Sequence, residues 1–396
     1  MEILVWLLAA GLALWLAALI ANLLYNRSAL IISSRMEFPL SEHPKVSILI
    51  PARNEAKNLS LTLPGLLAQE YPNYEVILAD DASTDETAIL AEEYSRKHPG
   101  KLKVVRISSL PENWNGKIHA LHQAMNAASG EWLIATDADI VFHPKALRAG
   151  LWIAARERAE LVTIYAYLEC ITFWERLLLP GFGFMLATLF PIGKINNPTS
   201  SVALASGGYI LMRRKTWQQL GGYQAIQSEM IDDLNTARLI KHSGNRIYAA
   251  VTKDLIRTRM YQSLAGIWEG LRKNSFAGSR YSIVRHCIVV AVDLLCNLLP
   301  LVCLTYIGWN FATNNTMGTL KNVAGYLSLA QYLLSVMMHL PVIVFYRIPI
   351  FYALLVPIGA LIYGVISMDS MLRTLLGRGV SWKSRKYGKS TVVSNR

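Results

Sequence analysis

Charged residues are scarce in this chain of 396 residues. Asp, Glu, Lys and Arg make up 17% of the sequence, whereas hydrophobic residues make up 53%. An ordinary soluble domain has about 25% charged residues. The deficit therefore predicts a membrane protein.

Several signatures of common binding sites are also missing. The four cysteines form no C-x-x-C pair, which argues against a zinc site and against a disulfide framework. No G-x-x-x-x-G-K-[ST] motif is present, which excludes a P-loop enzyme. No G-x-G-x-x-G motif follows the first expected strand, which argues against a Rossmann dinucleotide site.

Long apolar runs are what the sequence has instead. From Ile3 to Tyr25 there is no charged residue, and a helix of that length crosses a hydrocarbon core of roughly 30 Å. We interpret residues 1–25 as a retained transmembrane anchor, because a cleaved signal peptide would have a basic start and a small-x-small cleavage site. Later runs predict a C-terminal membrane region, residues 288–372, with two or three segments. These runs are Ile288–Phe311, Val323–Tyr346 and Ile348–Met368.

The net charge of +12 comes from basic residues that gather beside the apolar runs. By the positive-inside rule, this pattern predicts a multi-pass protein of the inner or plasma membrane with its polar block in the cytoplasm and no nucleic-acid partner. Three full C-terminal spans would place the basic tail, residues 373–396, outside, whereas one re-entrant segment would keep it inside. The sequence leaves both arrangements open. The flanking residues are Arg27, Arg35, Arg272, Lys273, Arg280, Arg285, Arg373, Arg378, Lys383, Arg385, Lys386 and Lys389.

Between the membrane regions, short β-branched runs alternate with helical stretches. This rhythm predicts a doubly wound α/β fold with a mostly parallel sheet. Ser83 and Glu86 have the spacing of a capping box at the start of one helix. The expected strands are Val46–Pro51, Glu75–Asp80, Leu102–Ile107 and Trp132–Asp137, and the expected helices lie near residues 55–69, 84–97 and 116–128.

Polar and acidic residues follow three of these strands at their carboxyl ends, where doubly wound sheets bind ligands. In an extended segment, Asp137 and Asp139 would face the same side. Two carboxylates without Cys or His beside them suit a hard cation such as Mn²⁺ or Mg²⁺, which keeps open positions for phosphates. Lys117, at the start of an expected helix, is either a phosphate-binding residue or a solvated surface lysine.

Four motifs, in order, resemble those of the inverting nucleotide-sugar transferases of glycosyltransferase family 2. They are PARNE (51–55), DDASTD (80–85), NGKIHALHQA (115–124) and TDADI (136–140). Each motif is weak alone, but the ordered set is specific. The resemblance covers residues 45–280 and implies a cytoplasmic catalytic domain with the GT-A fold, flanked by N- and C-terminal transmembrane helices.

The resemblance also implies roles for individual residues around the donor. Asp137 and Asp139 match the family's D-x-D pair, which holds a divalent metal, Mn²⁺ or Mg²⁺. The resemblance favours Asp139 as the direct metal ligand, and Asp137 also lies at the donor. Lys117 matches a basic donor-binding position. The residues expected around the base and ribose of the donor are Ala52, Asn54, Glu55 and Asp81.

On the acceptor side, Gly207 and Gly208 lie in a stretch similar to the family's small-residue turn. The segment Ile231–Ala237 is similar to the E-D segment that opens a helix, and Asp233 falls on the position of the general base. Asp232 replaces the usual glutamate. A helix N-terminus here should favour the ionised form of Asp233; the alternative is an ordinary charge pair at a helix start.

The region after the expected base lacks the Q-x-x-R-W motif of processive synthases, since Gln262 and Trp268 have a different spacing. It looks instead like the membrane-bound transferases that glycosylate carotenoids, hopanoids and similar lipids. Trp268 either covers the acceptor or packs the domain against the bilayer. The apolar segment Arg176–Lys194 is either an interfacial segment or a buried core helix.

The leading hypothesis is a membrane-bound, metal-dependent inverting glycosyltransferase. It would move a single sugar from a nucleotide-sugar donor, expected to be UDP-linked, to a lipid acceptor such as a carotenoid, a hopanoid or another polyisoprenoid or glycolipid. One alternative is a processive polysaccharide synthase, which a polymeric product would identify. The other is a non-catalytic nucleotide-sugar-binding membrane subunit, which would bind the donor without turnover.

Overall fold

The computed structural model describes residues 1–26, 29–313, 318–378, 380–382 and 385–387. The chain divides into two compact units. The unit that we call the sheet unit comprises Ser28–Glu169 and Ile192–Met260. The other, which we call the membrane unit, comprises Met1–Arg27, Cys170–Pro191 and Tyr261–Arg396. Part of the expected basic tail, including Lys383 and Lys389, lies outside the described residues.

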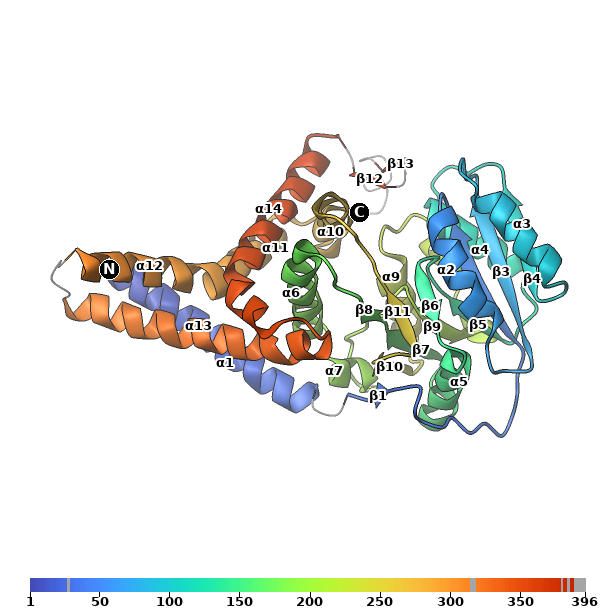
Figure 1. Cartoon of the computed structure of the whole chain (residues 1–396), viewed down its shortest axis with the longest axis horizontal. Helices are drawn as coiled ribbons and strands as arrows, with labels where there is room; N and C mark the ends of the chain where they lie inside the picture. The colour runs from blue at the N-terminus through green and yellow to red at the C-terminus, as the bar shows by residue number, and fades with distance from the viewer. Residues whose placement is uncertain (27–28, 314–317, 379, 383–384, 388–396) are drawn as a thin grey trace. The chain divides into compact units, whose positions relative to one another are not determined.

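An eight-stranded sheet forms the centre of the sheet unit (Figure 1). The strand order is β1-β10-β7-β9-β5-β2-β3-β4, and every neighbouring pair is parallel except the two pairs that β9 makes with β5 and β7. The expected mostly parallel sheet is confirmed. Its strands are β1 (Ile31–Ile32), β2 (Val46–Ala52), β3 (Tyr74–Asp81), β4 (Leu102–Ile107), β5 (Trp132–Ala135), β7 (Leu161–Tyr165), β9 (Ile210–Arg213) and β10 (Ile247–Thr252).

A second sheet has the strand order β6-β11-β8. Its first strand along the chain, β6, begins directly after Asp139. The expected strand Trp132–Asp137 ends early, at Ala135, and the next residues turn toward β6. The prediction that Asp137 and Asp139 lie on an extended strand was therefore wrong, because this segment has to reverse between two sheets. The three strands are β6 (Ile140–Phe142), β8 (Tyr167–Leu168) and β11 (Ile256–Thr258).

Helices cover both faces of the large sheet. Ile48 and Ile50 of β2 are fully buried in one core cluster with Leu59 and Leu63 of α2. Leu49 is also fully buried, but its side chain points to the other face, where α4 packs against β2 and β3. The helices of this unit are α2 (Ala56–Leu67), α3 (Thr87–Lys97), α4 (Gly116–Ala127), α5 (Ala146–Glu157), α7 (Ile192–Asn196), α8 (Arg214–Gln219) and α9 (Asp232–His242).

The capping box expected at Ser83 and Glu86 does not form. Helix α3 begins at Thr87, whose N–H donates to Asp85 Oδ1 (3.0 Å) rather than to Ser83. The Ser83 hydroxyl instead accepts a hydrogen bond from the Asn54 backbone N–H (3.0 Å). A partner in the neighbouring loop thus replaces the local one, so Ser83 joins two strand ends rather than opening a helix.

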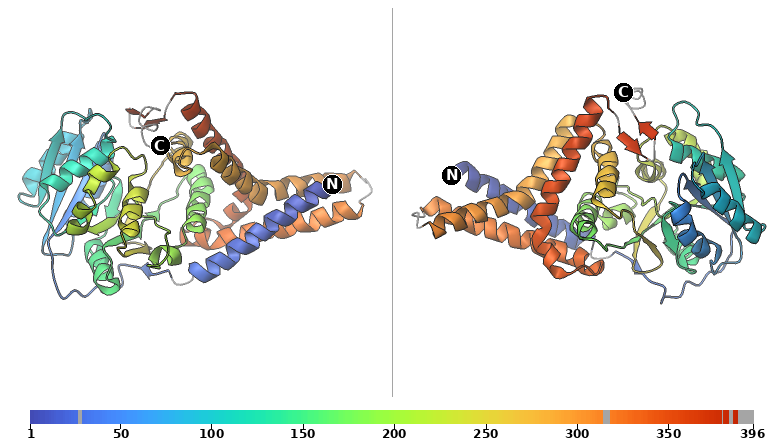
Figure 2. Two further views of the ribbon diagram at one scale, coloured as in Figure 1. Left: turned by 180° about the vertical axis from the view of Figure 1, so that it is seen from behind. Right: turned by 45° about the horizontal axis from the view of Figure 1, so that its top comes forward.

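The membrane unit contains four helices that are long and apolar enough to cross a membrane: Glu2–Tyr25, Ile283–Ala312, Thr319–Phe345 and Ile350–Leu375. Figures 1 and 2 show α12 and α13 side by side, and α1 packs along α13. The expected N- and C-terminal transmembrane helices are confirmed to this extent. The elements are α1 (Glu2–Tyr25), α6 (Phe173–Leu189), α10 (Leu264–Gly278), α11 (Ile283–Asp293), α12 (Leu299–Ala312), α13 (Thr319–Phe345), α14 (Val356–Leu375), β12 (Val380–Trp382) and β13 (Arg385–Tyr387), with a π-helical turn at Leu294–Leu298 and a 3₁₀ turn at Ile350–Leu355.

One segment from the middle of the chain, Cys170–Pro191, completes this unit. Helix α6, which includes most of the apolar segment 176–194, packs against α13, α14 and α10. Its Leu177, Leu178 and Leu179 are buried with Ile267 and Leu271 of α10. Within the membrane unit, α6 is therefore a packed helix of the core.

Candidate active site

Three carboxylates and one lysine meet around Gly207. The Lys117 Nζ atom lies 2.7 Å from Asp137 Oδ1 and 2.9 Å from Asp232 Oδ2. A Cβ atom added to Gly207 would lie 2.9 Å from Asp137 Oδ2, 3.3 Å from Lys117 Nζ and 3.6 Å from Asp233 Oδ2. Asp137, Lys117 and Asp233, which are far apart in sequence, thus converge on Gly207, and Asp232 joins them through Lys117.

The Asp233 carboxylate is held by backbone donors at the start of α9. Its Oδ2 accepts a hydrogen bond from the Gly207 N–H (3.1 Å), and its Oδ1 accepts one from the Leu234 N–H (2.7 Å). Burial, and then the charge of Asp232, nevertheless raises the pKa of Asp233 to about 6. The Leu234 N–H at the helix start lowers the pKa of Asp233, in the predicted direction, but burial and Asp232 outweigh this contribution. A carboxylate with this pKa is ionised at neutral pH but is ready to accept a proton.

Asp139 lies deeper than Asp137 and makes a different contact. The Thr258 hydroxyl, at the end of β11, donates to Asp139 Oδ2 (3.4 Å). Burial, and then the nearby charge of Asp137, raises the pKa of Asp139 to about 7. This pair of carboxylates is short of positive charge, and its oxygen atoms are the donors that Mn²⁺ or Mg²⁺ prefers. The pair therefore fits the expected cation.

The described residues include no group of three or more His, Cys, Asp or Glu side chains arranged to hold a metal ion. A cation at Asp137 and Asp139 would take its other ligands from water and substrate phosphates, which is the usual arrangement for Mg²⁺. Because the sequence predicts neither a zinc site nor a histidine ligand, this observation contradicts no metal prediction.

The predicted donor-side residues lie at the carboxyl ends of two neighbouring strands. Ala52, the last residue of β2, is paired with Asp80 of β3, and both are buried. In the two loops that follow, Asn54 and Ala82 adopt left-handed backbone conformations, with φ of 53° and 50°. Strain of this kind in an alanine persists only where the surroundings require it, and it clusters at functional sites.

Side-chain hydrogen bonds tie these two loops together. Arg53 Nη1 donates to the Asp81 carbonyl oxygen (2.6 Å), and Asn54 Oδ1 accepts from the Thr84 N–H (2.8 Å). The buried Glu55 accepts from Asn58 Nδ2 (2.7 Å). Ala52, Asn54, Glu55 and Asp81 therefore come from one continuous rim of the sheet.

The remaining predicted residues divide between the two units. Gly208 lies beside Gly207, and a Cβ atom there would meet Ile140 Cδ1 at 2.9 Å. Trp268 belongs to the membrane unit, where its indole N–H donates to Asp369 Oδ2 of α14 (2.9 Å). Within its own unit, Trp268 thus contacts a candidate membrane-spanning helix.

Thr258 and Arg53 are contact residues that sequence reasoning did not assign. Thr258 is 119 residues from Asp139 in sequence, and no local pattern indicates their hydrogen bond. Arg53 stands inside the PARNE motif, so its charge next to Asn54 and Glu55 was a usable signal.

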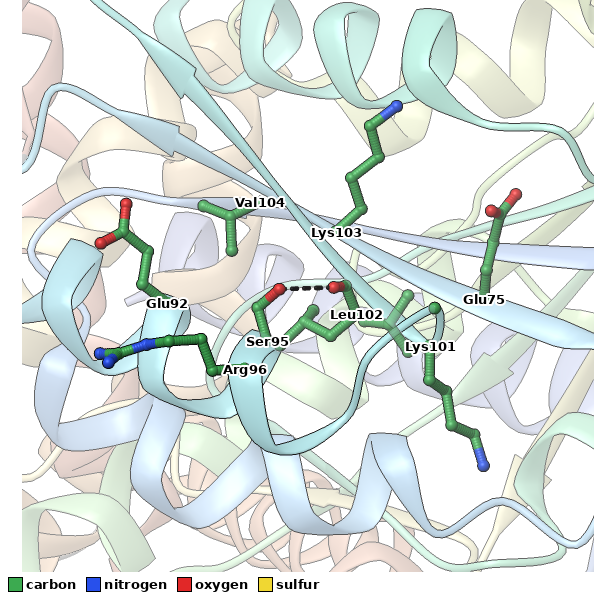
Figure 3. A pocket seen from close by; sticks show the side chains of 10 residues that line it. Glu75, Glu92, Ser95, Arg96, Lys101, Leu102, Lys103 and Val104 are labelled. Carbon is green, nitrogen blue, oxygen red and sulfur yellow. Dashed lines mark hydrogen bonds between the residues drawn. The ribbon is translucent and has the colours of Figure 1, made fainter.

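A separate cavity of about 630 Å³ lies at the other end of the sheet, where β3 and β4 begin (Figure 3). The Ser95 hydroxyl of α3 donates to the Leu102 carbonyl there (2.8 Å). In Figure 3 the side chains of Lys101, Lys103 and Arg96 point away from one another. Because these cations do not converge, the cavity lacks a built anion site.

Comparison with known proteins identifies the sheet unit. Residues 47–221 match the family described as glycosyl transferase family 2. This segment is a family 2 glycosyltransferase domain. The chain is also similar in fold to the mannosyltransferase PcManGT from Pyrobaculum calidifontis, solved in complex with GDP-Man and Mn²⁺, with a TM-score of 0.50 and 19% identity over 83% of this chain and 98% of that one. The expected GT-A fold is thereby confirmed.

Two curated relatives match shorter stretches. The 4,4'-diaponeurosporenoate glycosyltransferase of Staphylococcus aureus (strain MRSA252) is 33% identical over 120 residues, which is 30% of this chain and 30% of that protein. EpsE of Bacillus subtilis (strain 168) is 25% identical over 216 residues, which is 53% of this chain and 71% of that protein. The expected similarity to a carotenoid-type transferase is confirmed, although the match spans less than a third of the staphylococcal protein.

Proposed function

We propose that this protein is a membrane-bound inverting glycosyltransferase that moves one sugar from a nucleotide-sugar donor to a lipid acceptor. The observation that supports this most strongly is the convergence of Asp137, Lys117 and Asp233 on the open space at Gly207. Residues 47–221 of the chain form a family 2 glycosyltransferase domain. The four candidate membrane spans and the staphylococcal relative favour a lipid over a soluble acceptor.

In the proposed reaction, Asp233 is the general base. An acceptor hydroxyl or carboxyl at the open space of Gly207 gives its proton, where it carries one, to Asp233 while its oxygen attacks the anomeric carbon. The bond from that carbon to the donor phosphate breaks on the opposite side, so the configuration inverts and the nucleoside diphosphate leaves. The Gly207 N–H holds Asp233 Oδ2 in place for this transfer. The raised pKa of Asp233 lies close to the pH at which a general base works best.

The leaving diphosphate carries the charge that the other residues would balance. Asp137 and Asp139 would hold a divalent cation, Mn²⁺ or Mg²⁺, which neutralises the diphosphate when bound. Lys117 lies close enough to Asp137 to contact the same phosphates. Ala52, Asn54, Glu55 and Asp81 would bind the nucleoside part, and Gly207, Gly208 and Asp232 would border the acceptor.

The membrane arrangement belongs to the same proposal. Basic residues beside the apolar runs favour a catalytic domain on the cytoplasmic side of an inner or plasma membrane. Trp268 would then act by packing α10 on α14 within the membrane unit, rather than by covering the acceptor.

Nucleotide release by the detergent-purified full chain tests this function. The chain is offered UDP- and GDP-sugars, with UDP-sugars first, plus a polyisoprenoid lipid extract, in the presence of Mn²⁺, Mg²⁺ or EDTA. We expect release that needs both the metal and the extract, with a lipid that gains the mass of one sugar. The D233N variant should release nucleotide at least about 10²-fold more slowly, and R106Q, which alters an exposed ion pair, should match the wild type. A polymeric product would replace the proposal with a processive synthase, and donor binding without turnover would replace it with a binding subunit.

A further inference from the structure

The contacts of Lys117 set it apart from an ordinary donor-binding lysine. Its ammonium group touches Asp137, a proposed ligand of the cation, and at the same time Asp232, which opens α9. A single lysine therefore occupies the position next to Asp137 where a second positive charge would have to bind. Two cations at contact distance from one carboxylate repel each other strongly in a partly buried site.

The backbone of Lys117 is fixed, whereas its tip has room to move. Asn115 caps α4 by accepting the Lys117 N–H (3.0 Å), and the Asn115 N–H donates to the Gln227 carbonyl (2.7 Å). The Lys117 side chain remains 29% exposed. Four methylene groups separate the fixed backbone from the ammonium group, so Nζ can swing by a few ångströms without a change in the helix.

We propose that Lys117 is a movable counter-ion that competes with the divalent cation for Asp137, and that Asp232 is the positioning residue that retains it. This inference rests on the proposed function, because it takes Asp137 as a cation ligand. In the donor-free protein, Nζ bridges Asp137 and Asp232. When the cation binds Asp137, Nζ leaves that carboxylate and stays with Asp232, within reach of the arriving diphosphate.

The exposure of the two partners supports this division of roles. The Asp137 side chain is 36% exposed, so a cation can reach it from solvent, whereas the Asp232 side chain is only 13% exposed. Lys117 Nζ lies slightly closer to Asp137 (2.7 Å) than to Asp232 (2.9 Å), but water screens the contact with the less exposed Asp232 less, and an arriving cation reaches Asp137 first. Asp232 is therefore the partner that Lys117 keeps.

Binding of Mn²⁺ to the donor-free full chain tests the proposal without any catalytic readout. Free Mn²⁺ is followed by electron paramagnetic resonance during titration of wild type, K117Q, K117R and D232N. Removing the competing charge in K117Q should tighten Mn²⁺ binding by about ten-fold, as expected for one charge at contact distance in a partly solvated site. K117R keeps the charge and should bind Mn²⁺ as weakly as the wild type.

The D232N variant should weaken Mn²⁺ binding, because Lys117 loses its other partner and stays on Asp137. Removing any negative charge from the cluster also weakens cation binding, so D233N is the matched control: Asp233 hydrogen-bonds to the backbone N–H groups of Gly207 and Leu234, and its charge acts on Lys117 less than the charges of Asp137 and Asp232 do. We expect D232N to lose several-fold more affinity than D233N. In a K117Q background, the losses caused by D232N and D233N should become equal.

Equal Mn²⁺ affinity of wild type and K117Q would overturn the proposal, as would equal losses in D232N and D233N with Lys117 present. Nucleotide release by the wild type, measured on the same preparation, reports the proposed function separately. Metal-dependent release with unchanged K117Q affinity refutes the counter-ion and leaves the transferase standing. Tighter Mn²⁺ binding by K117Q without release from any donor supports the counter-ion and refutes the transferase.

Discussion

Glu75, at the amino-terminal end of β3, and Asp233, at the opposite end of the sheet, are both partly buried carboxylates in very different surroundings. Glu75 Oε1 accepts hydrogen bonds from the Ser47 hydroxyl (2.6 Å) and from the N–H and hydroxyl of Ser129 (2.7 Å each). Burial raises the pKa of Glu75, but these hydrogen bonds outweigh it and bring the pKa below its ordinary value. At Asp233, burial and Asp232 win, and the pKa rises.

The difference separates carboxylates that hold the fold together from carboxylates that are held ready for a ligand. Glu75 joins three chain segments and has its charge fully compensated. Asp233 and Asp139 have too little compensation within the sheet unit, which is unfavourable for the isolated protein but suits a proton or a cation arriving with substrate. The raised pKa values of Asp233 and Asp139 therefore indicate that the candidate functional site lies at this end of the sheet.

The largest effect that we expect is a loss of transfer activity when Asp233 is substituted. The D233N variant keeps an oxygen that accepts the Gly207 N–H but has no basic oxygen, so the rate of sugar transfer should fall by about 10²–10⁴-fold. Donor binding, measured by calorimetry with the nucleotide sugar and Mn²⁺, should stay within a few-fold of wild type. Near-normal turnover in D233N would remove Asp233 from its assigned role.

The second effect concerns the open space between the carboxylates. In G207A the added Cβ atom would lie 2.9 Å from Asp137 Oδ2, closer than such contacts normally come, so Asp137 has to shift. A displacement of this size should lower kcat/KM by about ten- to a hundred-fold. G278A is the matched control, because nothing lies within 4 Å of its added Cβ atom, and it should behave as wild type. Equal activity of the two variants would show that the space at Gly207 is not used.

At the other end of the sheet, the expected effect is on stability alone. E75Q keeps one amide oxygen for the three donors of Ser47 and Ser129 but removes the negative charge that strengthens these hydrogen bonds, so unfolding should become easier by about 1–3 kcal/mol. Transfer activity per folded molecule should not change. The control E92Q alters an exposed ion pair and should shift stability by less than about 0.5 kcal/mol. A loss of activity in E75Q at unchanged stability would reverse the assignment of the two ends.

Much of this fold follows from local sequence patterns, and the limits of those patterns have physical reasons. The strand Leu102–Ile107 was predicted to the residue, because a run of β-branched residues between turns has one easy conformation. β9 was missed because its four residues, Ile210–Arg213, are too few to show a period. Its antiparallel pairing with β5 and β7 depends on chain reversals that no local pattern encodes.

The same division applies to the candidate site. Asp137, Asp139 and Lys117 stand in recognisable motifs, so their types and order could be read from the sequence. The contact of Lys117 with Asp232 joins residues 115 positions apart and depends on how α4 and α9 meet. At Ser83 a local pattern gave a wrong prediction. The spacing of Ser83 and Glu86 fits a capping box, but the Ser83 hydroxyl accepts from the Asn54 N–H of the neighbouring loop instead.

The smallest effect is a pH-dependent gain in stability in D139N. Because burial and Asp137 raise the pKa of Asp139 to about 7, well above its value of about 3.9 in an unfolded chain, the folded protein binds this proton more tightly. Stability from this group is therefore present at low pH and is lost as the pH rises through about 7. In EDTA at pH 8, the wild type has to bury a charge that D139N lacks, so D139N should melt about 2–4 °C higher if the difference is about 1 kcal/mol. At pH 5 the advantage should shrink, because Asp139 is then protonated in the folded wild type.

The E75Q variant should show the opposite dependence of stability on pH. Glu75 has a lowered pKa, so its contribution to stability is present above its unfolded pKa and is lost only at low pH. Parallel melting curves of wild type, D139N and E75Q at both pH values would decide the comparison, and an advantage of D139N that is equal at pH 5 and pH 8 would contradict it.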